Sequence, residues 1–146
     1  YIVGSDDWTS FDSADPTVSN GRIERWAKTD GTSICPVGFR VPTETELVAE
    51  TIADSIQDTD TNSDGNIEVT NMLTAFQNFL KIPAAGFKNT SNPTIRNSGT
   101  TVFLWTNTHR NASTEAKYLD ARTSVNSASI SELTRGFGGS VRCIED

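Results

Sequence analysis

The spacing of apolar positions predicts two helices in the first half of the chain. Between residue 44 and about residue 57, apolar side chains recur at helical spacing, and Thr43 and Glu46 stand in the positions of a capping box. After a polar, acidic stretch, a second apolar stripe predicts another helix, which ends before Pro83 because proline cannot continue a helix. We expect this stripe to face the core; it consists of Met72, Leu73, Phe76, Phe79 and Leu80.

From residue 82 onward the apolar positions alternate with a period of two, which is typical of strands. Clusters of turn-forming residues separate the extended runs, and three runs are predicted as strands: residues 102–105, 117–122 and 140–144. Helices followed by several short strands predict an α+β fold with a mainly antiparallel sheet.

Length and composition indicate one globular domain. The chain of 146 residues can enclose a core, and 35% hydrophobic with 21% charged residues is typical of a folded domain. A net charge of −7 argues against a nucleic-acid partner, and no apolar run is long enough to span a membrane. Residues 1–146 are therefore predicted to be a single domain. Because the chain starts at Tyr1 without a signal peptide, we expect it to be excised from a longer protein.

The acidic stretch between the two predicted helices has the spacing of a calcium loop. Side-chain oxygens recur at every second residue and a glycine, Gly65, follows the third of them, which allows a sharp turn around one cation. Crowded carboxylates repel one another unless a cation sits among them. The predicted Ca²⁺ ligands are Asp58, Asp60, Asn62, Asp64, Asn66 and Glu68.

This loop departs from the EF-hand pattern at its last position. If Asp60 is position one, position twelve is Asn71, where an EF-hand carries a bidentate glutamate. A more distant oxygen would then complete the coordination shell. The alternative is a solvated acidic linker without a metal. Mg²⁺ is disfavoured because it takes fewer protein ligands and keeps its waters.

The two cysteines, Cys35 and Cys143, lack the spacing of a metal or redox motif. They are either a disulfide of an exported protein or two unrelated buried thiols. Abundant Asn and Thr, few lysines and the calcium loop favour the exported protein.

Four fragments in the same order resemble a known family. Residues 35–43 are similar to CPxGFRVPT, residues 79–87 to FLKLPAAGYR, and residues 139–146 to SVRCIKD, which are motifs of a bacterial branch of the C-type lectin-like fold, the major-paralogous-domain group. Residues 103–107 stand where that group carries YYWSS, but they lack both tyrosines and both serines. The insertion with the calcium loop resembles the peptide-binding domains of bacterial RTX adhesins.

The resemblance implies a C-type lectin-like domain with long loops, in which Cys35 is bonded to Cys143. It also implies a ligand surface between the strand of Trp105 and the last strand, and a calcium ion that helps to hold the terminal carboxylate of a peptide. Stacking and carboxylate pairing suit the predicted ligand-binding residues, which are Trp105, Asn107, Tyr118 and Arg135. For Trp105 the alternative is core packing.

The leading hypothesis is a calcium-dependent peptide-binding module of a bacterial surface adhesin, located outside the cell and mediating attachment. A calcium-dependent carbohydrate-binding lectin domain is the alternative, although the chain has no EPN or QPD sugar triplet. A third possibility is a calcium-stiffened spacer. We do not expect an enzyme, because His109 is the only histidine and no nucleophile-elbow or phosphate-loop motif is present.

Overall fold

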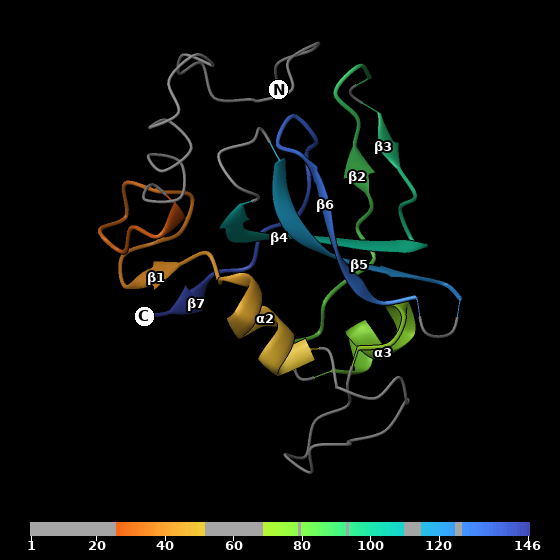
Figure 1. The fold of residues 1–146 in the computed structure, drawn as a ribbon, viewed down its shortest axis with the longest axis horizontal. Coiled ribbons are helices and arrows are strands. Elements are labelled where there is room, and N and C mark those ends of the chain that lie inside the picture. The colour runs from red at the N-terminus through yellow and green to blue at the C-terminus, as the bar shows by residue number, and fades with distance from the viewer. Residues whose placement is uncertain (1–25, 52–68, 79, 93, 110–114, 125–126) are drawn as a thin grey trace.

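A three-stranded antiparallel sheet is the largest element of the computed structural model, which describes residues 26–51, 69–78, 80–92, 94–109, 115–124 and 127–146 (Figure 1). The strands are β4 (Thr101–His109), β5 (Glu115–Arg122) and β6 (Ser129–Thr134), in the order β4-β5-β6. Leu104 lies opposite Leu119, and Leu119 lies opposite Ile130. The register therefore places a row of apolar side chains across all three strands.

Two short strand pairs and two helices complete the described fold. The strand β1 (Phe39–Arg40) pairs with β7 (Ile144–Glu145), and β2 (Phe87–Lys88) pairs with β3 (Ile95–Arg96), both antiparallel. The helices are α2 (Glu44–Thr51) and α3 (Met72–Gln77), and neither has the length and hydropathy of a membrane span. The predicted α+β fold with antiparallel sheets is confirmed, and so are the predicted strands over 102–105 and 117–122.

The predicted last strand, residues 140–144, is wrong for most of its length. Ser140 makes one isolated bridge to Leu104, and regular pairing begins only at Ile144. The chain leaves the edge of β4 after Ser140 and crosses to β1, so residues 141–143 have no neighbouring strand among the described residues. Alternation in the sequence predicted an extended chain here but could not show this change of partner.

The two faces of the sheet carry different cores. On one face, Leu104 and Leu119 pack with Leu47 of α2 and Ala75 of α3, so both helices cover this side. The side chains of the opposite face are mainly aromatic, and Phe87 of β2, Phe137 and Val141 are among the residues that pack against them. We call this second set the aromatic cluster; its buried members are Phe103, Trp105, Ala116 and Tyr118. Alternate positions of β4 and β5 point to the two cores, as the period of two predicted.

A disulfide joins the end of the chain to the segment before β1. Cys35 and Cys143 are bonded, with their Cα atoms 5.8 Å apart. The pairing that the family resemblance implied is thus confirmed, and the alternative of two free thiols is wrong. The backbone N–H of Asp146 also donates to the carbonyl of Gly38 at 3.1 Å, so covalent and hydrogen bonds hold the same two segments together.

The first turn of α2 forms as its sequence predicted. The backbone N–H of Thr43 donates to Oε2 of Glu46 at 2.8 Å, and the backbone N–H of Glu46 donates to Oγ1 of Thr43 at 3.3 Å. Both partners of the predicted capping box are therefore engaged. The described part of the helix ends at Thr51, and the remainder of the predicted helix lies outside the described residues.

The second predicted helix forms, but its apolar stripe does not face the core as a whole. Leu73 and Phe76 are 58% and 59% exposed, while Met72 and Leu80 pack against the core and Phe79 lies outside the described residues. The buried face of α3 instead presents Thr74 and Ala75. Oγ1 of Thr74 accepts the backbone N–H groups of Thr70 and Asn71, at 2.8 and 3.0 Å, so satisfying these donors takes precedence over burying the larger apolar residues.

An ion cluster around Arg40 links β1, α2 and the end of the chain. The guanidinium binds both carboxylate oxygens of Glu46, at 2.9 and 2.6 Å, and its Nε binds Oδ1 of Asp146 at 2.6 Å. Hydrogen bonding from Arg40, the largest cause, lowers the pKa of Glu46 from 4.5 to about 2, although burial opposes this shift. The stabilisation is therefore full above pH 4.5 and is lost as the pH falls towards 2.

We expect Glu46→Gln to lower the melting temperature at neutral pH and to make less difference as the pH falls from 4.5 towards 2, because the native carboxylate becomes protonated over that range. Thermal melts of both proteins across this range measure the effect. Glu50→Gln on the exposed side of α2 is the matched control. A melting-temperature difference that stays constant or grows on acidification would contradict the prediction.

Candidate functional site

All six predicted calcium ligands lie outside the described residues, namely Asp58, Asp60, Asn62, Asp64, Asn66 and Glu68. Their coordination stays a prediction. Within the described part of the chain, no group of three or more His, Cys, Asp or Glu side chains is arranged to hold a metal ion. The described residues on either side of this stretch do show how its two ends are held.

The two ends of the acidic stretch meet in the core. The backbone N–H of Val69 donates to the carbonyl of Thr51, and both residues are almost fully buried. Nδ2 of Asn78, which follows α3, donates to the carbonyl of Glu50 in α2 at 3.2 Å. Thr51 and Val69, the described residues on either side of positions 52–68, therefore meet at one buried point, which we call the stem.

Asn71, at position twelve of the proposed calcium loop, caps α3. Its Oδ1 accepts the backbone N–H groups of Leu73 and Thr74 at 2.8 and 3.1 Å. This oxygen satisfies two donors of the first helical turn, which explains an asparagine at this position. Any ion in the preceding stretch would thus lie directly before a capped helix start.

Trp105 and Tyr118, two of the predicted ligand-binding residues, lie next to each other in the aromatic cluster. Their ring centroids are 5.5 Å apart, and Tyr118 stacks on Phe103 at 4.0 Å. Both side chains are buried, and their contacts are those of core packing, which was the alternative for Trp105. Burial, and secondly the charge of Asp120, raises the pKa of the Tyr118 hydroxyl.

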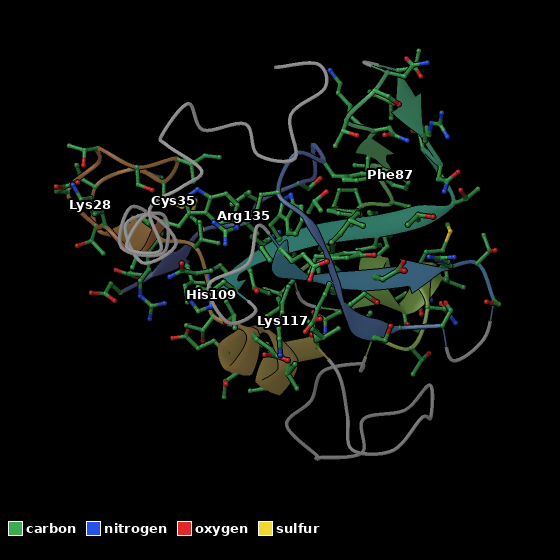
Figure 2. All side chains as sticks on the ribbon, turned by 45° about the horizontal axis from the view of Figure 1, so that its top comes forward. Lys28, Cys35, Phe87, His109, Lys117 and Arg135 are labelled. Atoms are coloured by element: carbon green, nitrogen blue, oxygen red, sulfur yellow. A yellow bond between two sulfur atoms is a disulfide. The ribbon has the colours of Figure 1, made fainter. Side chains whose placement is uncertain are left out.

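Asn107 and Arg135 lie at the end of the β4–β5 pair where the two strands connect. Asn107 is 8% exposed; its backbone N–H donates to the carbonyl of Pro42 at 2.7 Å, while its buried Oδ1 has no hydrogen-bond partner among the described residues. Arg135 is 7% exposed and donates from Nη2 to the carbonyl of Glu115, the first residue of β5, at 3.3 Å. Figure 2 shows Arg135 between the sheet and Cys35. The structure thus buries all four predicted residues, but only Asn107 and Arg135 lie at this end; Trp105 and Tyr118 lie in the middle of β4 and β5.

Gly139 lies directly over the aromatic cluster. A Cβ at this position would come within 2.3 Å of the Phe103 ring and 2.9 Å of Nε1 of Trp105. The backbone at Gly139 therefore approaches buried rings closely. No local sequence signal could have revealed this contact.

Arg40 is the charged residue of greatest consequence that the sequence pattern did not single out. The capping box identified Glu46, but Arg40 pairs with both Glu46 and Asp146, which is 106 residues away. The local hints were its place six residues before Glu46 and inside the fragment similar to CPxGFRVPT.

Comparison of the chain with protein-family models, with curated proteins and with solved structures found no match.

Proposed function

We propose that this chain is a calcium-dependent peptide-binding module of a bacterial surface adhesin, with a C-type lectin-like fold, and that it mediates attachment outside the cell. The observation that carries the proposal is the stem. Oxygen-rich residues at calcium-loop spacing begin and end at one buried point, where Val69 bonds to Thr51. A cation bound by these residues would hold a segment whose two ends are already attached to α2 and to the start of α3. The free energy of cation binding would therefore stabilise the fold.

The disulfide supports the location. Cys35–Cys143 is a bond that persists in oxidising surroundings, such as the outside of a bacterial cell, and is rare in the cytosol. An acidic domain also gains from calcium a local positive charge that an anionic ligand could contact. The ligand class most consistent with this chemistry is a peptide with a free terminal carboxylate.

The described candidate residues take three roles in this proposal. Trp105 and Tyr118 support the site from within the aromatic cluster, because their rings pack against each other and Phe103. Asn107 offers the polar contact, because its buried Oδ1 still has an acceptor position to fill. Arg135 fixes the start of β5 through the Glu115 carbonyl.

Calcium is expected to raise thermal stability. At a calcium concentration 100 times the Kd, linkage adds about 2.7 kcal/mol to the free energy of unfolding, which corresponds to roughly 5–10 °C in Tm for a chain of this size. Thermal melts with calcium and with EGTA measure this gain. The double variant Asp60→Asn with Asp64→Asn should lose it, whereas Glu50→Gln, an exposed carboxylate in α2, should retain it. Equal melting temperatures with calcium and EGTA would contradict the proposed metal site.

Ligand binding is tested by isothermal titration with three pools: short peptides with free carboxylates, the same peptides amidated, and common monosaccharides. The proposal expects heat from the free-acid peptides in calcium, little from the amidated peptides, and none after EGTA. Heat from the sugars alone would replace the peptide-binding proposal with a lectin. A calcium-raised Tm without heat from any pool would indicate a stiffened spacer.

A further inference from the structure

Helix α2 is bonded to different parts of the fold at its two ends. Its last residue, Thr51, lies in the stem, where its carbonyl accepts the backbone N–H of Val69. The carbonyl of Glu50 accepts from Nδ2 of Asn78, beyond α3, at 3.2 Å. The helix starts on the side of β1 and β7 and runs towards α3 (Figure 1). It therefore connects the stem with a distant part of the fold.

Three contacts join the start of α2 to the end of the sheet where β4 finishes. The backbone N–H of Glu44, the first helical residue, donates to Oγ1 of Thr108 at 2.8 Å. Oε2 of Glu44 accepts from Nζ of Lys117 in β5 at 2.7 Å (Figure 2). The backbone N–H of Asn107 donates to the carbonyl of Pro42, just before the helix, at 2.7 Å. Since the first N–H groups of a helix have no acceptor inside it, Thr108 satisfies one of them.

The pairing of β4 with β5 is irregular at the same place. The register shifts between Trp105 and His109, and irregularities of this kind redirect side chains. Within this stretch the hydroxyl of Thr106 donates to the carbonyl of Lys117 at 3.0 Å, so a side chain makes a bond between the two strands. Asn107 lies in the middle of the irregular stretch. Its position therefore depends on the start of α2 as well as on β5.

A helix of this length depends on its surroundings for stability. Even the full predicted helix, from residue 44 to about residue 57, falls within the lengths at which an isolated helix is only marginally stable in water. In the fold, Leu47 packs into the core and the two ends are bonded as described above. Bonds that hold one end of such a helix raise the population of the ordered helix, and so they also favour order at the other end.

We propose that α2 couples the stem to the irregular end of β4, so that ordering of the stem also orders Asn107. The inference rests on the proposed function, in which calcium binds beside the stem and Asn107 contacts the ligand. Calcium would then strengthen ligand binding through the fold, without a direct contact between the ion and the ligand. Because linkage is reciprocal, a ligand that orders Asn107 would also raise the affinity for calcium.

The variant Thr108→Val tests the coupling without calcium and without ligand. It keeps the shape of the side chain and removes the acceptor of the Glu44 N–H. Amide hydrogen exchange is measured at Val69 in the stem, and at Leu119 in the middle of the sheet, which reports global unfolding. We expect exchange at Val69 to become about two- to fivefold faster, because the helix loses one of the hydrogen bonds that keep it ordered.

The variant Thr100→Val is the matched control. Oγ1 of Thr100 donates to the carbonyl of Asn97 at 3.0 Å in the turn before β4, so this change also removes one hydroxyl bond, but at the end of β4 away from α2. Exchange at Val69 should stay unchanged in this variant, while Leu119 reports the loss of global stability in both. Equal acceleration at Val69 in the two variants, or none in Thr108→Val, would overturn the coupling.

Calcium alone is the second probe. It should slow exchange of the Asn107 amide by about fivefold or more, and Thr108→Val should lose most of this slowing while Thr100→Val keeps it. A calcium-raised melting temperature with unchanged exchange at Asn107 would overturn the coupling and leave the proposed metal site intact. If calcium changes neither quantity, the proposed metal site fails, and the comparison of the two variants without calcium still decides whether α2 couples its two ends.

Discussion

Removing the Cys35–Cys143 disulfide is expected to lower the free energy of unfolding by about 4–5 kcal/mol. The bond closes a loop with a sequence separation of 108. In the chain-entropy description, opening a loop of that length restores this much freedom to the unfolded chain. Since a domain of this kind has a total stability of roughly 5–15 kcal/mol, the loss is large enough to unfold a fraction of the molecules at growth temperature.

Denaturant melts of the double variant Cys35→Ala with Cys143→Ala measure this loss. Chemically reduced protein is the matched control, because it keeps both sulfur atoms and breaks only the link between them. If both lose the same stability, the bond itself is responsible rather than the smaller side chains. A loss below about 1 kcal/mol in the reduced protein would contradict the entropic account.

Gly86→Ala is expected to cost about 2–4 kcal/mol, the second large effect. Gly86 has a φ of +72°, and a Cβ there would lie 2.1 Å from the carbonyl oxygen of Arg96 and 2.7 Å from the backbone nitrogen of Ser98. These are backbone atoms around the β2–β3 pair, and Gly86 itself donates to Thr101 at the edge of β4. The β2–β3 pair and the edge of β4 cannot move apart without breaking the hydrogen bond from Gly86 to Thr101.

Gly99→Ala is the matched control. Gly99 has a φ of +78°, yet nothing lies within 4 Å of its ideal Cβ position. It therefore reports the cost of the left-handed backbone alone, about 1 kcal/mol. The difference between the two variants, measured by urea melts, isolates the steric contact. Equal losses at both glycines would show that Gly86 is required only for its backbone conformation.

The parts of the fold that the sequence predicted are those set by neighbouring residues. The capping box needs only Thr43 and Glu46, and alternation along β4 and β5 follows from the pleat of a strand. Helix α3 forms as predicted, but the expectation that its whole apolar stripe faces the core was wrong, because periodicity weighs apolar residues only. The buried N–H groups before the helix required the Thr74 hydroxyl, and Leu73 and Phe76 were turned outward.

The candidate site was less predictable because it depends on contacts between distant residues. Trp105 and Tyr118 are on neighbouring strands, so a ring contact between them could be expected. The close packing of the Gly139 backbone on the rings of Phe103 and Trp105 could not. Arg40 meets Asp146 only after the whole chain has folded. For the predicted calcium loop, spacing alone identified the candidate oxygens. The structure adds the backbone hydrogen bond from Val69 to Thr51, which joins the two residues that flank this stretch.

The disulfide has a mechanical consequence for the domain when it is pulled from both sides of the bond. A pull between the segment before Cys35 and the end of the chain passes through the sulfur–sulfur bond, so the sheet and both helices carry none of the tension along their backbone. The 108-residue separation keeps roughly 360–390 Å of chain from being drawn out. A domain closed in this way stays short and keeps its sheet folded under load for as long as that bond remains oxidised.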